Sequence, residues 1–484
     1  MMSRATRSIG SRALAGLLAE WRTGSPAYTA LARAVTVALL DGRLPLRCRL
    51  PSERELAAGL GVSRTTVTAA YDALRASGHL QSRRGSGTWT ALPAAARYRA
   101  PGWAATEVTG TVGPRYELAG AAPAGPPDVL AAAARDALED LPRHLAGDGY
   151  DPVGLAALRD AVADRYRRRG VPTSAEQILI TSGALHGLDL ALRLLVRPGD
   201  RVVTDTPSYP TALDAIRASG ARLVPVGLGR DGWNVDLLVA SYAQSAPRLG
   251  YLVADFHNPT GLVMPDEARA AAAAAAASAG ACLVVDESFV DLCYDAGALD
   301  VAPVAGHDPD GHVLSIGSLS KPFWGGLRVG WIRADPELVT RLAAVRAITD
   351  MAGPVLEQLV ARRLLEQADD VLPGRRREFA ERRDALAGAL HRELPKWQFR
   401  PPGGGLAIWV ELDAPVSTAL AIAAGQRGVR LAAGPRFGVE GTLERYLRLP
   451  FVHPAGELDE AVTRIAAARA GLAAGGARVP QLVP

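Results

Sequence analysis

Apolar spacing divides the chain into a short helical region and a longer region in which helices and strands alternate. From Pro26 to Leu40 apolar side chains recur at helical spacing, and Asp41-Gly42 ends the pattern. A second helix is predicted over 52–60, because Ser52 can cap it and acidic residues follow in its first turn. A third helix is predicted over 64–77, after a short turn whose Ser63 can cap it.

Two helices joined by a short glycine-containing turn form a helix-turn-helix unit, whose second helix enters the major groove of DNA. Residues 79–90 predict a hairpin with an arginine-glycine tip, which makes the unit a winged helix-turn-helix. Seven side chains stand where base edges and phosphates are reached: Arg49, Arg54, Arg64, Thr65, Thr66, Arg83 and Arg84. We therefore expect a DNA-binding module over residues 25–92, followed by an alanine-, proline- and glycine-rich linker over 93–115.

From Tyr116 onward the alternation of elements is typical of an α/β domain. Strands are predicted at 178–180, 201–203, 249–254, 281–285 and 313–316. Ligands of open α/β sheets lie beyond the carboxyl ends of the strands, so the side chains there are expected to converge: Ser182, Tyr209, Asn258, Asp286 and Lys321. The turn at 181–184 leads into a helix whose free amides favour a phosphate.

Charge and composition narrow the possible partners. The 484 residues are too many for one core, and residues 1–92 hold 13 arginines against 5 acidic residues, whereas the remainder carries a balance of −4. This contrast predicts a polyanionic partner for the first part only, although compositional drift could produce the charge difference alone. Three scattered cysteines indicate neither a disulfide framework nor a metal site, and we expect no membrane span or signal peptide and a cytoplasmic location.

Lysine is rare in this chain, since only Lys321 and Lys396 occur among 54 basic residues. A guanidinium stays charged, whereas a desolvated lysine can lose its proton and act as a nucleophile. Taken alone, Lys321 could be an ordinary loop lysine, Tyr209 could be a core residue and Asp286 a helix cap. Together with the phosphate-favouring turn they describe a pocket for pyridoxal phosphate.

Two resemblances to known families support this interpretation. The first 92 residues resemble the GntR family of winged-helix regulators in the runs 50–57, 61–67 and 70–74 and in the wing 83–88. Residues 116–475 resemble the fold type I aminotransferases in five motifs that occur in the same order. The second resemblance implies an α/β domain over 116–478 with a mixed, mostly parallel sheet and a smaller C-terminal α+β subdomain.

The aminotransferase resemblance also implies roles for individual residues. Lys321 would form a Schiff base with the cofactor, and Tyr209, Asn258 and Asp286 would stack on its ring, bind its phenolic oxygen and pair with its pyridine nitrogen. The phosphate ligands would be Ser182, Gly183, Ala184, Ser318, Ser320 and Arg328, with Tyr150 reaching the phosphate of a partner subunit. Arg448 would bind the carboxylate of an amino acid. The chain departs from the family's pattern at Phe289, where the family often has a tyrosine, and at Leu185-His186, where similar regulators often have glutamines.

A GntR-like module in front of an aminotransferase-like domain resembles the MocR/GabR-type regulators. The resemblance implies a dimeric, pyridoxal phosphate-dependent transcriptional regulator that binds an operator and senses an amino compound, or the cofactor itself, through the Lys321 aldimine. The alternative is an active aminotransferase with a DNA-binding appendage, because all the residues for transamination are present. The sequence leaves the effector, the operator and the direction of regulation open.

Overall fold

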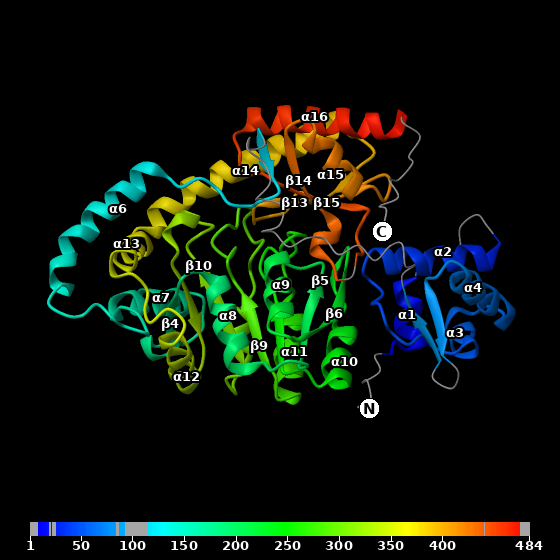
Figure 1. Cartoon of the computed structure of the whole chain (residues 1–484), viewed down its shortest axis with the longest axis horizontal. Helices are drawn as coiled ribbons and strands as arrows, with labels where there is room; N and C mark the ends of the chain where they lie inside the picture. Colours follow the sequence, from blue (N-terminus) through cyan, green and yellow to red (C-terminus); the bar gives the residue numbers. More distant parts are fainter. Residues whose placement is uncertain are drawn as a thin grey trace.

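The computed structural model describes residues 8–18, 21, 26–83, 87–91, 115–439 and 441–474. Figure 1 shows an N-terminal module at one end of the molecule, beside β6 (Arg222–Gly229) and α10 (Val235–Ser245) of a large α/β domain. A smaller subdomain lies above one edge of that domain's sheet. The two-module α/β organisation that the sequence predicts is confirmed.

The N-terminal module is a winged helix-turn-helix. It contains α2 (Ala27–Leu40), α3 (Glu53–Leu60), α4 (Arg64–Ala76) and the antiparallel hairpin of β1 (Leu80–Arg83) and β2 (Gly87–Thr90). Ser52 and Glu55 form a capping box at the start of α3, and Ser63 caps α4 by accepting the Thr66 amide at 3.1 Å. One further helix, α1 (Ser11–Leu17), contributes Leu14 to the module's core. It was not predicted, because seven residues are too few to establish a helical pattern.

The large domain is organised on an eight-stranded sheet. Its order is β4 (Ile178–Thr181), β11 (Gly330–Arg333), β10 (Val313–Ser318), β9 (Cys282–Asp286), β8 (Leu249–Leu252), β5 (Arg201–Thr206), β6, β7 (Gly232–Trp233). From β10 to β6 all neighbours run parallel, whereas β11 and β7 are antiparallel to theirs. The central strands are buried along most of their length, as expected for a sheet covered on both faces.

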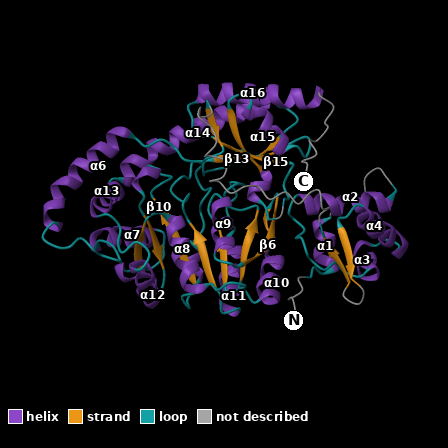
Figure 2. Cartoon of the chain, in the orientation of Figure 1, coloured by secondary structure: helices purple, strands orange, loops and turns teal. Residues whose placement is uncertain are grey.

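Helices cover both faces of this sheet (Figure 2). They are α6 (Pro127–Asp140), α7 (Ala156–Arg168), α8 (Ala184–Leu195), α9 (Pro210–Ala218), α10, α11 (Asp266–Ser278), α12 (Pro336–Ala347) and α13 (Val355–Glu366). Two separate apolar clusters result, one containing α7 and α11 and the other containing α8 and α12. The alanine side chains of α11 are small, so this helix packs closely on its neighbours, and Ala272 and Ala276 are fully buried.

The C-terminal subdomain is built on a five-stranded sheet. Its strand order is β12 (Gln398–Phe399), β13 (Ala407–Glu411), β15 (Tyr446–Pro450), β14 (Val429–Ala433), β3 (Tyr116–Leu118). The helices α14 (Ala368–Glu393), α15 (Ser417–Gly425) and α16 (Ala455–Ala474) complete it. Since β3 comes from the start of the domain and pairs parallel with β14, the two ends of the domain are tied together. None of the described helices is long and apolar enough to cross a membrane.

Candidate functional site

The structure brings together the side chains that follow the carboxyl ends of the central strands. Lys321 lies within electrostatic range of Asp286, Arg328 and Arg448. Tyr209, at the start of α9, lies within range of the same three residues. Asn258 joins the group through a hydrogen bond to Arg448. Residues that are up to 266 positions apart in the sequence, from Ser182 to Arg448, therefore face one site.

Lys321 is an amine in a desolvated position. Its Nζ donates to the Ala121 carbonyl at 2.8 Å and lies 5.9 Å from the centre of the Phe289 ring. Burial, followed by the positive charges of Arg448 and Arg328, lowers the pKa of Lys321 to about 8, against the opposing effect of Asp286. A much larger fraction of this lysine is therefore uncharged near neutral pH than of an ordinary lysine, which suits an amine nucleophile.

An anion cradle lies at the start of α8. Gly183 is its N-cap residue with φ +101°, and a Cβ there would lie 3.1 Å from Nη2 of Arg328. Arg328 is exposed and donates to the Ser182 carbonyl. The hydroxyls of Ser318 and Ser320 are hydrogen-bonded to each other at 2.9 Å. A helix N-terminus, a guanidinium and two hydroxyls fit the charge and size of a phosphate group.

His186 completes the turn that carries the cradle. The Ser182 amide donates to Nδ1 of His186 at 3.0 Å, and Nε2 lies 3.8 Å from Asp350. Burial, followed by the charges of Arg346 and Arg328, lowers the pKa of His186, although Asp350 opposes this shift. Because Nδ1 accepts a hydrogen bond, the neutral imidazole is the form that this turn requires. The sequence marks His186 only as a departure from the family's glutamine.

Asp286 is held rigidly at the end of β9. Its Oδ2 accepts from the Tyr251 hydroxyl at 2.9 Å, and its Oδ1 accepts from the Ser288 amide at 3.0 Å. Burial, followed by the charge of Asp286, raises the pKa of Tyr251 well above its ordinary value, so the hydroxyl remains a donor. A carboxylate fixed in this way can pair with a cationic ring nitrogen.

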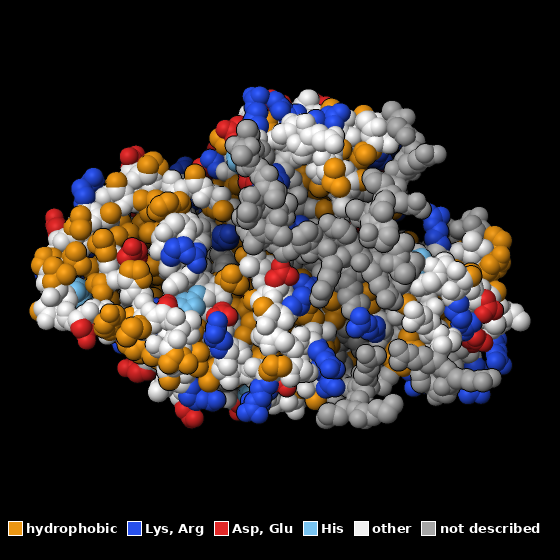
Figure 3. Space-filling view, viewed as in Figure 1, with side chains coloured by type: hydrophobic (Ala, Val, Ile, Leu, Met, Phe, Trp, Pro, Cys, Tyr) orange, Lys and Arg blue, Asp and Glu red, His pale blue; other side chains and the backbone are white. Residues whose placement is uncertain are grey.

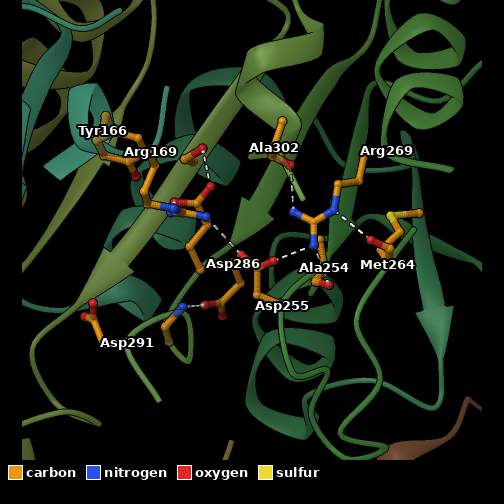
Figure 4. A network of polar contacts seen from close by, with 12 residues as sticks. Tyr166, Arg169, Ala254, Asp255, Met264, Arg269, Asp286, Asp291 and Ala302 are labelled. Carbon is orange, nitrogen blue, oxygen red and sulfur yellow. Dashed lines mark hydrogen bonds and ion pairs between the residues drawn. The ribbon is translucent and has the colours of Figure 1, made fainter. Parts of the chain in front are cut away.

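Figure 4 shows a network of polar contacts around Arg169 and Arg269, and its Ala254 and Met264 lie at the two ends of the segment that carries Asn258. Arg269 is fully buried and donates to the carbonyls of Met264 and Ala254, at 2.8 and 3.3 Å, which lie at the two ends of that loop. It also pairs with Asp255 at 2.5 Å. Arg269 was missed by the sequence analysis, although it is the single charged residue inside the alanine run of α11.

Arg169 extends this network toward Asp286. Its guanidinium pairs with Glu287 at 3.1 Å and with Asp255 at 3.5 Å. Burial opposes its charge, but the two carboxylates outweigh burial and raise the pKa of Arg169. The strand ends that carry Asn258 and Asp286 are thus bound to each other through one cation.

Arg448, on β15, is a buried cation with no carboxylate partner among the described residues. It is 4% exposed, donates to Asn258 Oδ1 at 3.2 Å and to the Ala119 carbonyl, and its Nε has no partner. Its guanidinium carbon lies 4.9 Å from the centre of the Phe437 ring. Burial lowers the pKa of Arg448 to about 10, with Arg436 adding to the effect and Tyr209 opposing it. Such a site favours an incoming anion.

A small hollow adjoins Lys321 and Asn258. Its apolar walls come from Ala121, Phe256, Phe289 and Leu406, and His257 and Asn258 lie at its edge. Lys321 reaches the hollow through its contacts with Ala121 and Phe289. His257 is buried, is hydrogen-bonded to Thr260 through Nδ1 and packs edge-on against Trp233. These contacts hold it in place as part of the lining of the hollow.

The predicted DNA contacts lie at the start of α4 and beside the wing. Arg64 and Thr65 are exposed, and the Ser63 hydroxyl bonds the hydroxyls of Thr65 and Thr66 at 2.7 and 2.8 Å. Arg54 is exposed on α3, and exposed Arg49 lies against the hairpin, since a Cβ on Gly87 would be 2.7 Å from its Nε. Arg84 and the side chain of Arg83 lie outside the described residues.

Comparisons with known proteins agree with both halves of this architecture. Residues 116–465 match the family described as aminotransferase class I and II, and residues 27–89 match the gntR family of bacterial regulatory proteins. The chain is 30% identical to the probable rhizopine catabolism regulatory protein MocR of Rhizobium meliloti, over 77% of this chain and 78% of that protein. It is 28% identical to the HTH-type transcriptional regulator TauR of Rhodobacter capsulatus, over 90% and 95% of the two chains.

A solved aminotransferase structure is similar to the large domain. LysN, the α-aminoadipate aminotransferase of Thermus thermophilus crystallised with N-(5'-phosphopyridoxyl)-L-leucine, is 30% identical, with a TM-score of 0.67 over 74% of this chain and 92% of its own. The lysine, the cradle and the strand-end carboxylate described above fit pyridoxal phosphate, and the expectation of this cofactor is confirmed. The chain therefore belongs to the class I and II aminotransferase family and carries a GntR-family DNA-binding module in front of that domain, the arrangement of the MocR-type pyridoxal phosphate-dependent transcription regulators.

Proposed function

We propose that this regulator senses an amino compound that carries a carboxylate, and that Lys321 and Arg448 are its two points of recognition. The observation that carries the proposal is the buried Arg448 guanidinium, whose Nε has no hydrogen-bond partner within the described part of the chain and which lies within electrostatic range of Lys321. A carboxylate would compensate this charge, and an amine on the same molecule would face Lys321. A planar guanidinium is suited to binding a carboxylate through two parallel hydrogen bonds.

The residues around Lys321 are assigned to the cofactor as follows. Lys321 would hold the cofactor through its amine, Asp286 would pair with the ring nitrogen, Tyr209 would stack on the ring and Asn258 would bind the phenolic oxygen. The phosphate is held by Ser182, Gly183, Ala184, Ser318, Ser320 and Arg328. When bound, the cofactor supplies a carbon that a primary amine can attack. Lys321, with its lowered pKa, would provide the uncharged amine that an effector amine replaces.

The apolar hollow narrows the class of effector. Its walls are formed by Phe256, Phe289 and Leu406, with no acidic or basic side chain among its lining residues apart from His257 at the edge. The free space in the hollow is about 10 Å³, room for about one water molecule, so an effector side chain would lie against its apolar wall. A charged side chain would lose part of its hydration there without gaining a partner. We therefore infer that the effector is an amino acid with an uncharged side chain. The cofactor alone remains the other effector that the sequence leaves open.

We propose that the protein is a homodimer. We also propose that it is located in the cytoplasm, where it would bind its operator. Hydrophobic side chains gather at the end of the molecule where α6 and α13 lie (Figure 3). Leu145 and Tyr150, which follow α6, are 70% and 62% exposed, and Ile348 and Met351, between α12 and α13, are 88% and 52% exposed. A second copy of the chain would cover these side chains. In such a dimer Tyr150 would contact the phosphate site of the partner subunit.

The test is a DNA-binding titration of the full-length, cofactor-loaded protein on its own upstream DNA, measured by fluorescence anisotropy. L-alanine, L-leucine, γ-aminobutyrate and L-glutamate are added separately, and we expect L-alanine or L-leucine to change the affinity at least about 5-fold. Arg64→Ala should weaken DNA binding in every ligand state by about 1–3 kcal/mol, whereas exposed Arg193→Ala on the large domain should not.

The alternative function is tested with the same preparation. Conversion of these amino acids to keto acids, with 2-oxoglutarate as acceptor, is followed over many turnovers. Turnover at about 1 s⁻¹ or more, together with no preference for the upstream DNA over unrelated DNA, would establish the aminotransferase instead. The preserved Lys321 and Asp286 make this assay necessary, because both would serve either function.

A further inference from the structure

The winged helix and the large domain are joined by main-chain contacts at one turn. Leu443, which precedes β15, donates its amide to the carbonyl of Leu40 at the end of α2, at 2.7 Å. Leu443 is 1% exposed and has φ +75°, a conformation that is rare for leucine. The position of α2 is therefore coupled to the position of Leu443.

Two glycines allow the turn after α2 to approach the sheet. Gly42 has φ +73°, and a Cβ there would lie 3.1 Å from Thr206 Cγ2. On the facing strand β6, a Cβ on Gly227 would lie 2.4 Å from the Gly42 carbonyl and 2.6 Å from the Arg43 carbonyl. No side chain larger than hydrogen fits at Gly227 while this contact exists. By contrast, a Cβ on Gly229 would meet only ordinary contacts.

Leu443 is also packed against the residues that surround the effector arginine. It belongs to a small cluster with Phe437, Tyr446 and Ala119. The Phe437 ring lies beneath the Arg448 guanidinium, and its carbonyl accepts the amide of Ser208 at 2.8 Å, next to Tyr209. Ala119 accepts a hydrogen bond from Arg448. One cluster thus touches the arginine on one side and the winged helix on the other.

Charged groups near the turn are paired within it and across it. Asp41 is 8% exposed and pairs with Arg43 at 3.3 Å, and Glu411 and Arg445 of the large domain lie within electrostatic range of Asp41. Burial raises the pKa of Asp41, and Arg43 opposes the shift. Charges of both signs therefore lie close together at this closely packed junction. Because the packing leaves little free space, a displacement of Leu443 would also move its neighbours.

We propose that Phe437 and Leu443 transmit the occupancy of Arg448 to the winged helix, through the Leu443–Leu40 hydrogen bond and the contact between Gly227 and the turn at 42–43. This inference rests on the proposed function, because it assumes that a carboxylate binds Arg448. An anion that draws the guanidinium away from the Phe437 ring removes a contact on which Phe437 and Leu443 are packed. The cluster then has two arrangements, and each favours a different position of α2.

The test uses full-length, cofactor-loaded protein and the four amino acids and upstream DNA named above. The measured quantity is the ratio of DNA dissociation constants with and without each amino acid. Gly227→Ala forces the turn at 42–43 away from β6, and we expect the ratio to fall from at least about 5 to near 1. Binding of the amino acids without DNA, followed by cofactor absorption, should be unchanged. Gly229→Ala on the same strand is the matched control and should behave as the wild type.

Leu443→Gly serves as a second variant, because it removes the side chain while keeping a residue that accepts φ +75°. It should also lower the ratio, which keeps the proposal testable if Gly227→Ala does not fold. A wild-type ratio near 1 with all four amino acids would overturn the proposed function and this inference together. A normal wild-type ratio that both variants retain would overturn this inference alone.

Discussion

Arg448 donates to Asn258 Oδ1 at 3.2 Å, so the residue that would bind the effector carboxylate is hydrogen-bonded to the residue that would bind the cofactor's phenolic oxygen. The two sites are therefore one polar unit. A change in the position of Arg448 would therefore act directly on Asn258. Under the proposed roles, this hydrogen bond would link binding of the effector to binding of the cofactor.

Arg448→Lys tests the carboxylate site. A lysine keeps the positive charge but cannot form two parallel hydrogen bonds, so we expect amino acid binding to weaken about 10- to 100-fold. The measurement is a titration followed by cofactor absorption. An amine without a carboxylate, such as butylamine, is the control and should bind both proteins alike. Equal weakening for butylamine would mean that the variant damages the cofactor site instead.

Lys321 should react with the cofactor at lower pH than an ordinary lysine. Its lowered pKa of about 8 means that the uncharged amine predominates above that pH, so the rate of cofactor incorporation should rise with pH through a midpoint near 8. Reduction with borohydride followed by peptide mass analysis should place the cofactor on Lys321. Exposed Lys396 is the internal control, and labelling of its peptide at the same rate would contradict the assignment.

His186 should make the protein less stable as pH falls. Because the pKa of His186 is lower in the folded chain than the value of about 6.5 in the unfolded chain, the unfolded chain binds the proton first. The free energy of unfolding should therefore decrease between pH 7.5 and 5.5, and His186→Gln should reduce that decrease. Denaturant unfolding at several pH values measures the difference. Identical pH profiles for both proteins would remove His186 from this role.

Arg269 should be essential for the stability of the large domain. Arg269→Met preserves much of the volume but leaves Asp255 buried with Arg169 as its remaining partner, and we expect a loss of about 3–5 kcal/mol. Exposed Arg193, paired with Asp189 one helical turn away, is the matched control, and Arg193→Met should change stability by no more than about 0.5 kcal/mol. Urea unfolding of the two variants makes the comparison, and similar midpoints would contradict the proposed support of the Asn258 loop.

Local chemistry in the sequence was enough to predict part of this structure. The serine caps at Ser52 and Ser63 and the wing hairpin depend on neighbouring residues, so their pattern can be read directly. The strand-end positions of Asp286 and Lys321 follow from the order of apolar runs. The fold class and the cofactor follow from these patterns together with the resemblance to known families, the regulator family follows from that resemblance, and all three are confirmed.

Other features depend on residues that are distant in the sequence and could not be read from it. His186 accepts the nearby Ser182 amide through Nδ1. Its other ring nitrogen faces Asp350, which lies 164 residues later in the sequence. Arg269 gains its role only when the two ends of the loop 254–264 meet it. The contact between Gly227 and the turn at 42–43 joins two modules whose relative position no local pattern records.

The most direct test of the central claim compares wild type with Lys321→Ala on the native upstream DNA. Affinity is measured with and without pyridoxal phosphate and then with L-alanine or L-leucine. The account predicts that both proteins bind the DNA, that only the wild type changes its affinity on adding cofactor and amino acid, and that the change is at least about 5-fold. An unchanged response in Lys321→Ala would contradict a regulator that senses its effector through this lysine.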